Sequence, residues 1–146
     1  MMRFKTLFPT LLAGLIAAAC GHGHDHGPTG EDDGHSHAAP HGGHVVDVGA
    51  GIAHLEVLHD DAAGTVTVYV LGKDVKTAVA LAKPMTLKLA TDEGPEELTG
   101  ELLADHEPAN SAFSWTSPAL EGEGATGRFS LELDGKSYSP DFEHDH

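Results

Sequence analysis

Short stretches in which apolar and polar residues alternate run through the chain from about residue 40 onward. In TVTVYVL (65–71) the three valines fall on one face of a strand, and the two threonines and the tyrosine fall on the other. MTLKLAT (85–91) repeats the pattern, with Met85 on its apolar face. RFSLELDGKSYSPDF (128–142) predicts a hairpin whose inward side chains include Phe129, because Asp-Gly at 134–135 favours a type I′ turn. A period of two residues predicts strands in all three segments.

Further segments extend this pattern over the rest of the chain. HVVDVGAGIAHLEVLHDDAAG (44–64) predicts two strands around a glycine-rich turn, and SAFSWT (111–116) predicts another. VKTAVALA (75–82) and ELTGELLA (97–104) are strand candidates that could also form short helical turns. About seven to nine short strands in roughly a hundred residues predict an all-β domain at 40–146, an antiparallel β-sandwich of immunoglobulin-like type. An open barrel is the main alternative.

The first twenty residues, MMRFKTLFPTLLAGLIAAAC, have the layout of a secretory signal. Basic residues at positions 3 and 5 precede an apolar run that is too short to span a membrane. The run ends in small residues and then Cys20, which is the only cysteine of the chain. This ending resembles the lipobox of bacterial lipoproteins, and the resemblance implies cleavage after residue 19 and acylation, including palmitate, at Cys20. The alternative is a plain signal peptide followed by an unpaired cysteine.

Lipidation would anchor an exported protein in the bacterial cell envelope, facing the periplasm or the cell surface. Each buried acyl CH₂ contributes roughly 0.8 kcal/mol, so two or three chains hold firmly. Gly21 follows the cysteine in place of the aspartate that retains many lipoproteins at the inner membrane, which favours the outer membrane. Residues 20–39 contain almost nothing to bury and predict a disordered, His-rich leash.

The charge balance limits the classes of partner. Cleavage removes two of the eight basic residues, which leaves six against 23 acidic residues and a formal charge of −17 with histidine neutral. Such a surface repels nucleic acid and anionic lipid head groups but attracts cations. The sequence also contains no Gly-rich phosphate loop and no nucleophile elbow around a serine, so we expect no catalytic activity.

Histidine is in marked excess, with twelve in the chain. Neutral imidazole binds divalent zinc, nickel, copper and cobalt, and the soft ligands that Cu(I) needs are scarce here. Alternate residues of an extended chain point the same way, so HGHDH (22–26) can present three imidazoles to one ion. The alternative is a solvated spacer. The candidate metal ligands outside the predicted strands are His22, His24, His26, His35, His37, His41, His144 and His146.

A more defined candidate lies in the predicted hairpin at 44–58. If Leu55 faces the core, His54 and Glu56 share the opposite face, and His44 on the preceding strand can come near them. Two imidazoles and a carboxylate match the ligands of a zinc-type site with an open fourth position. The alternative is the ordinary solvent face of a half-buried sheet. His59 and His106 fall in loop-like sequence, and we do not predict either of them as a metal ligand.

Residues 40–72, PHGGHVVDVGAGIAHLEVLHDDAAGTVTVYVLG, resemble a small module of exported heavy-metal efflux proteins, including the leading part of some cobalt–zinc–cadmium adaptor subunits. The likeness rests on the His-Gly-Gly start at 41–43, the His-x-Glu at 54–56, the acidic turn at 60–64 and the strand after it. It extends loosely through FSWTSPAL (113–120) to the end. The chain lacks the long helical hairpin and lipoyl-like half-motifs of an adaptor. The resemblance therefore implies the metal-facing module alone.

These observations together predict a lipid-anchored protein that binds or buffers divalent transition metal ions, for example for an efflux or uptake system. Metal binding through imidazole should weaken below about pH 6, as groups with a pKa near 6.5 protonate. A protein-interaction module whose His-rich segment is only a spacer is one alternative. A pH sensor that responds through its histidines without any metal is another.

Overall fold

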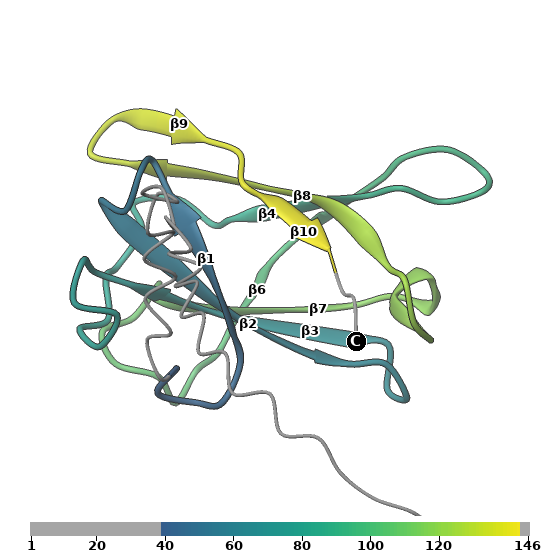
Figure 1. The fold of residues 1–146 in the computed structure, drawn as a ribbon, viewed down its shortest axis with the longest axis horizontal. Coiled ribbons are helices and arrows are strands. Elements are labelled where there is room, and N and C mark those ends of the chain that lie inside the picture. Colours follow the sequence, from purple (N-terminus) through teal and green to yellow (C-terminus); the bar gives the residue numbers. More distant parts are fainter. Residues whose placement is uncertain (1–38, 144–146) are drawn as a thin grey trace, which may run out of the picture. The chain divides into compact units, whose positions relative to one another are not determined.

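A computed structural model of the protein describes residues 39–143 (Figure 1). Ten strands and one short 3₁₀ helix, η1 (Pro118–Leu120), lie within this range. In the described part, no helix is long and apolar enough to cross a membrane. Several predictions fall on residues outside it, namely the lipidation site Cys20 and the candidate ligands His22, His24, His26, His35, His37, His144 and His146.

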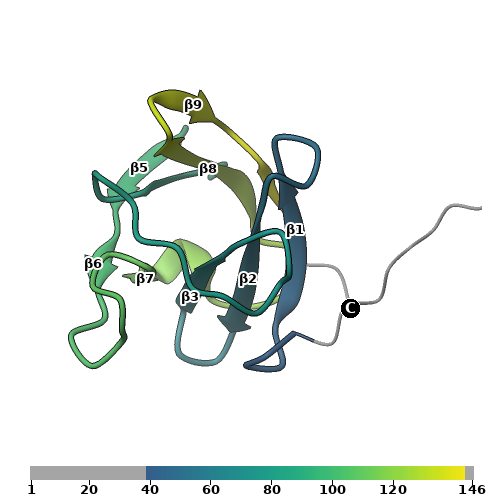
Figure 2. The same ribbon diagram turned by 90° about the vertical axis from the view of Figure 1, so that its left-hand side faces the viewer.

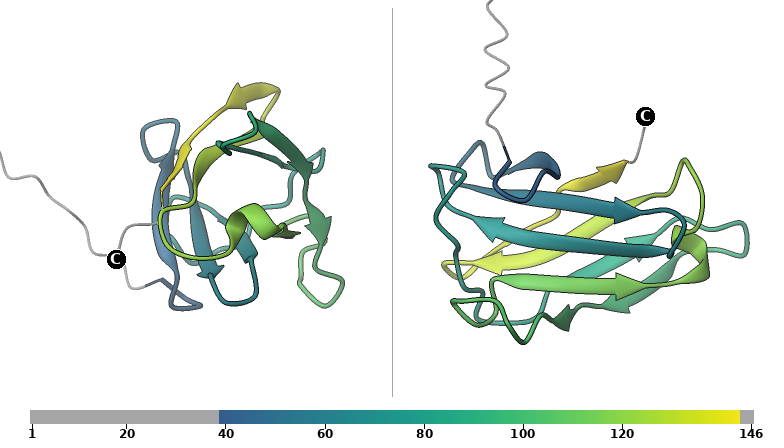
Figure 3. Two further views of the ribbon diagram at one scale, coloured as in Figure 1. Left: turned by 90° about the vertical axis from the view of Figure 1, so that its right-hand side faces the viewer. Right: turned by 90° about the horizontal axis from the view of Figure 1, so that it is seen from below.

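The strands form two antiparallel sheets, which confirms the predicted all-β sandwich (Figure 3). The first sheet has the order β1-β2-β3-β7-β6 and the second has the order β10-β8-β4-β5, with β9 paired to β8. The strands of the first sheet are β1 (His44–Val48), β2 (Ala53–Asp60), β3 (Thr65–Leu71), β7 (Ala112–Thr116) and β6 (Glu101–Leu102). Those of the second are β10 (Asp141–Glu143), β8 (Thr126–Leu133), β4 (Thr86–Leu89), β5 (Glu96–Thr99) and β9 (Lys136–Tyr138).

The core lies between the two sheets and is built from the apolar faces that the alternation predicts. The valines of β3 at 66, 68 and 70 are fully buried, and so are Met85 and Phe129. Aromatic rings join the layers, since the ring of Phe129 lies 5.5 Å from that of Trp115 and 5.6 Å from that of Phe142 between centroids. Burial of this apolar surface stabilises the domain, and no disulfide bridges the described sheets.

One extended segment takes part in both sheets. β5 pairs with β4 in the second sheet, and β6 pairs with β7 in the first (Figure 2). Gly100 separates the two strands and donates its N–H to the carbonyl of Met85 at 2.8 Å. A Cβ at this position would lie 2.7 Å from Cζ2 of Trp115, so only glycine lets the backbone pass this close to the tryptophan. The strand candidate at 97–104 is therefore confirmed over 97–99 and 101–102, with a break at residue 100, while residues 103–104 lie outside the strands.

The segment 75–82 differs from its strand prediction. It contains a single isolated bridge, between Leu71 and Ala78, and otherwise runs as irregular chain with neither strand nor helix. Asp74 explains the departure, because its carboxylate accepts the N–H groups of Lys76 and Thr77 and the Thr77 hydroxyl. A side chain that closes a local turn competes with ladder hydrogen bonds.

The predicted turn at the end of β8 is present. Asp134 and Gly135 have φ values of 51° and 75°, as a type I′ turn requires at both central positions. Leu133 pairs with Lys136 across it, and the hairpin continues into β9. The same alternation then places Phe142 of β10 in the core.

Candidate functional site

A fully buried carboxylate lies on the outer face of the first sheet. Leu55 and Val57 of β2 face the core, so the pleat turns Glu56 to the opposite face, as the sequence predicts. The register sets Glu56 directly opposite Tyr69 of β3. Although it is on an outer face, its side chain has 0% exposed surface. An ionisable group buried to this degree requires hydrogen-bond partners.

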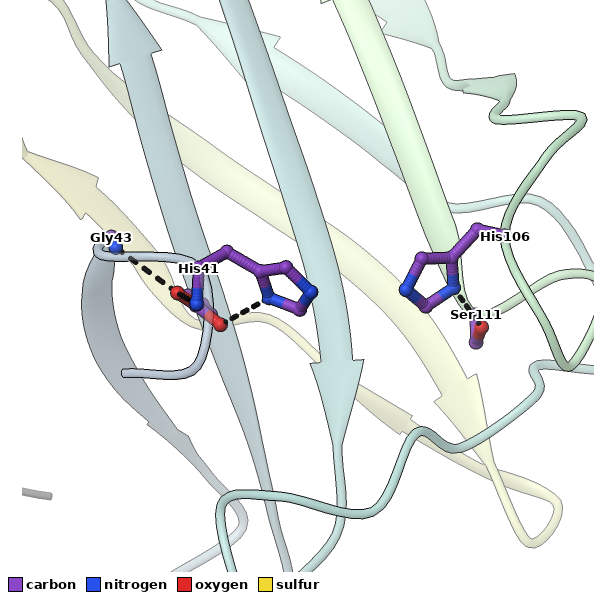
Figure 4. A network of polar contacts seen from close by, with 5 residues as sticks. His41, Gly43, His106 and Ser111 are labelled. Atoms are coloured by element: carbon purple, nitrogen blue, oxygen red, sulfur yellow. Dashed lines mark hydrogen bonds and ion pairs between the residues drawn. The ribbon is translucent and has the colours of Figure 1, made fainter. Parts of the chain in front are cut away.

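Those partners come from the loop that precedes β1. The backbone N–H groups of His41 and Gly43 donate to Oε1 of Glu56, at 2.6 and 3.0 Å. The Nδ1 atom of the His41 ring lies 2.8 Å from Oε2 (Figure 4). Three donors on one carboxylate satisfy the buried group and fix the loop on the sheet.

Gly43 allows this close approach. A Cβ there would lie 2.6 Å from the carbonyl oxygen of Val57 and 2.9 Å from Cγ of Glu56. The loop can therefore lie flat over the carboxylate only because position 43 has no side chain. The His-Gly-Gly sequence at 41–43 thus has a structural reason.

The carboxylate also determines the tautomer of His41. A carboxylate only accepts hydrogen bonds, so in the neutral ring the proton is assigned to Nδ1 and the lone pair to Nε2. The ring is stacked on Tyr69, with centroids 3.7 Å apart and planes inclined by 10°. The side chain of His41 keeps 34% of its surface exposed. Its Nε2 edge is thus held in one orientation by Glu56 and Tyr69.

His106, in the loop between β6 and β7, is held by a second short chain of hydrogen bonds. The hydroxyl of buried Ser111 donates to the carbonyl of Pro108 at 2.5 Å, and Nδ1 of His106 lies 2.9 Å from the same oxygen. Because the single hydroxyl proton goes to the carbonyl of Pro108, Ser111 Oγ accepts a hydrogen bond from the Nδ1–H of His106. In the neutral ring, Nε2 of His106 then carries the lone pair.

The two histidine rings lie next to one another over β3. Their centroids are 5.9 Å apart, and that of Tyr69 is 5.0 Å from His106. Figure 4 shows that the Nε2 atoms of His41 and His106 face one another, while both Nδ1 atoms point away to their partners. The arrangement presents two imidazole lone pairs to one space on the outer face of the sheet.

The structure does not assemble the cluster predicted around His44. In the hairpin register His44 is opposite Val57, whose side chain faces the core, so it lies on the other side of the sheet from Glu56. Val45, not His44, is the residue paired with Glu56. A shift of one residue in the pairing would be needed to bring His44 beside the carboxylate, because such a shift moves every side chain of the strand to the opposite face. His44 is exposed at the edge strand. His41, three residues earlier, takes the place beside Glu56.

His54 shares the outer face with Glu56, as predicted, but it has its own partners. Its Nδ1 lies 2.9 Å from the carbonyl oxygen of Gly72 and its Nε2 lies 3.2 Å from Oδ1 of Asp47. His59 similarly contacts the carbonyl of Leu120 through Nε2 at 2.6 Å. Within residues 39–143, no group of three or more His, Cys, Asp or Glu side chains is placed to hold a metal ion.

His106 is the site residue that sequence reasoning missed. It belongs to an irregular loop far along the chain from His41, and no fixed spacing connects the two. The one available signal is Ser111 five residues later, a polar residue at the entry to a buried strand. No family model, curated protein or solved structure matches this chain.

Proposed function

We propose that the protein is an exported, lipid-anchored component of the bacterial cell envelope that binds and buffers divalent transition metal ions. The observation that carries this proposal is the pair formed by buried Glu56 and His41. A carboxylate on one ring nitrogen orients the other nitrogen, and proteins use this pairing behind histidine ligands of metals. The proposed role is binding without catalysis.

Two features of the sequence support the same proposal. The excess of acidic over basic residues attracts cations to the domain. The histidines at 22–37 add imidazoles that would raise the number of ions bound per chain, with little selectivity among zinc, copper, nickel and cobalt. Acylation at Cys20 would keep this capacity at the membrane, where an efflux or uptake complex could exchange ions with it.

Calorimetric titration of the chain from residue 21 to residue 146 tests this function. We expect Zn²⁺, Cu²⁺ and Ni²⁺ to bind at pH 7.5 with at least one event of defined stoichiometry, followed by weaker binding. Mg²⁺ serves as the control, because it prefers oxygen ligands and a hydrated shell. If none of the transition metals binds more tightly than Mg²⁺, the function proposed here is wrong, and a protein-interaction module becomes the better hypothesis.

A further inference from the structure

We propose that Nε2 of His41 and Nε2 of His106 together bind one divalent transition metal ion on the outer face of the first sheet. This inference rests on the proposed function, because it names the ligands of the ion in the folded domain. The two residues come from loops before β1 and after β6, and Tyr69 of β3 forms the floor between them.

The separation of the rings fits a shared ion. A metal–imidazole bond is about 2.0–2.1 Å long, which places the ion roughly 3.2 Å from each ring centroid. Two imidazoles on one ion then have centroids about 5.2 Å apart at a tetrahedral angle and about 6.4 Å apart when they lie opposite each other. The observed 5.9 Å between His41 and His106 lies within this interval.

Each ring is independently prepared as a ligand. The carboxylate of Glu56 holds Nδ1 of His41, and the buried hydroxyl of Ser111 holds Nδ1 of His106. The Ser111 hydroxyl is itself committed to the carbonyl of Pro108, which prevents it from donating to the ring. Both Nε2 atoms are therefore presented as lone pairs in fixed orientations, and little side-chain freedom remains to be lost when an ion binds.

The surroundings select the class of ion. Imidazole suits zinc, copper, nickel and cobalt, whereas Mg²⁺ and Ca²⁺ require oxygen ligands. The carboxylate that contacts His41, that of Glu56, already accepts three hydrogen bonds and is buried beneath the loop. With two protein nitrogens from this pair, the ion keeps open positions for water or for a ligand from another molecule. Such a site would exchange its ion readily.

The test compares single variants in the chain from residue 21 to residue 146. We expect His41→Gln and His106→Gln each to weaken the first Zn²⁺-binding event at least tenfold in calorimetry. His44→Gln is the matched control, because His44 is an exposed histidine of the same region on the other side of the sheet. We expect it to leave that event unchanged. Far-ultraviolet circular dichroism checks that each variant is folded.

A measurement on the unaltered chain keeps the test independent of variant folding. We expect one equivalent of Zn²⁺ to shift the ¹⁵N resonances of Nε2 in both His41 and His106 in long-range ¹H–¹⁵N spectra, with Nδ1 of each ring still protonated. If Zn²⁺ binds but moves neither ring, or only one, the paired site is wrong while the proposed function stands. If no transition metal binds the chain, both proposals are wrong.

Discussion

The carboxylate of Glu56 and the imidazole of His41 meet at 2.8 Å, fifteen residues apart in sequence. The same contact satisfies a buried charge and orients a half-exposed ring. One side chain therefore has both a structural and a proposed functional role, and changes to Glu56 should alter stability and metal binding together.

Replacement Glu56→Gln preserves the shape of the side chain but removes its charge. Both backbone N–H groups donate to Oε1, so the amide oxygen can take its place, but the amide NH₂ then replaces Oε2 and Nδ1–H of His41 loses its acceptor. Hydrogen bonds to a charged group contribute about 1.5–3 kcal/mol each. We expect the free energy of unfolding, measured in urea, to fall by about 2 kcal/mol or more.

The control for this variant is Glu97→Gln, because Glu97 is an exposed carboxylate on β5. Its effect should stay within about 0.5 kcal/mol. The first Zn²⁺-binding event should also weaken in Glu56→Gln and remain unchanged in the control, with a loss of about 10–100-fold typical of such supporting partners. If Glu56→Gln and Glu97→Gln were equally stable, the hydrogen bonds to the buried carboxylate of Glu56 would not stabilise the fold.

Gly43→Ala tests whether the loop before β1 needs its close contact with β2. The new methyl group would overlap the carbonyl of Val57, which belongs to a paired strand and cannot move freely. We expect the loop to lift from Glu56, with a loss of about 1–3 kcal/mol in urea unfolding and weaker metal binding.

Gly72→Ala provides the comparison for that change. A Cβ at Gly72 would meet its nearest neighbours, Asp74 and Thr77, at 3.5 and 3.6 Å, which is ordinary van der Waals contact. Its effect should stay within about 0.5 kcal/mol. A Gly43→Ala variant as stable as Gly72→Ala would argue against the tight approach at the carboxylate.

Alternation of residues was sufficient to predict which faces of the strands are buried. It identifies the inward valines of β3 and places His54 and Glu56 together on the outer face. It does not determine register, and the observed pairing sets His44 opposite Val57. It also contains no information on which loop covers a given face. The meeting of His41 with His106 depends on the order of β2, β3 and β7 in the sheet, which only the complete topology supplies.

The sequence also predicts only some of the turns. Asp134–Gly135 determines its own turn, because both residues adopt positive φ there. The apolar run at 75–82 predicts a strand, but the hydrogen bonds of Asp74 close a turn at its start. A periodic pattern is thus overruled where a polar side chain captures the backbone next to it.

His54→Phe separates a structural histidine from a ligand. The sequence predicts His54 as a ligand from its place beside Glu56, but its ring nitrogens face the Gly72 carbonyl and Asp47. Phenylalanine fills a similar volume and leaves that carbonyl without this donor, which should lower the free energy of unfolding by about 1–3 kcal/mol. The first Zn²⁺-binding event should remain within about twofold of the unaltered chain. A loss comparable with that of His41→Gln would restore His54 as a ligand.

Asp74→Asn addresses the pH dependence of stability. Hydrogen bonds from the side chain and backbone of Thr77, and then from the backbone of Lys76, lower the pKa of Asp74 from 3.8 to about 2. A carboxyl whose pKa is lower in the folded protein stabilises the fold above its unfolded pKa, and this contribution is lost as pH falls through the folded value.

We therefore expect Asp74→Asn to melt at a lower temperature than the unaltered chain at pH 7. The difference should persist down to about pH 4 and then shrink toward pH 2, where Asp74 itself becomes protonated. Thermal unfolding followed by circular dichroism at a series of pH values measures it. Asp92→Asn is the control, because Asp92 is an exposed aspartate in another loop. A difference in melting temperature that is the same at pH 2 and pH 7 would mean that the charge of Asp74 does not stabilise this turn.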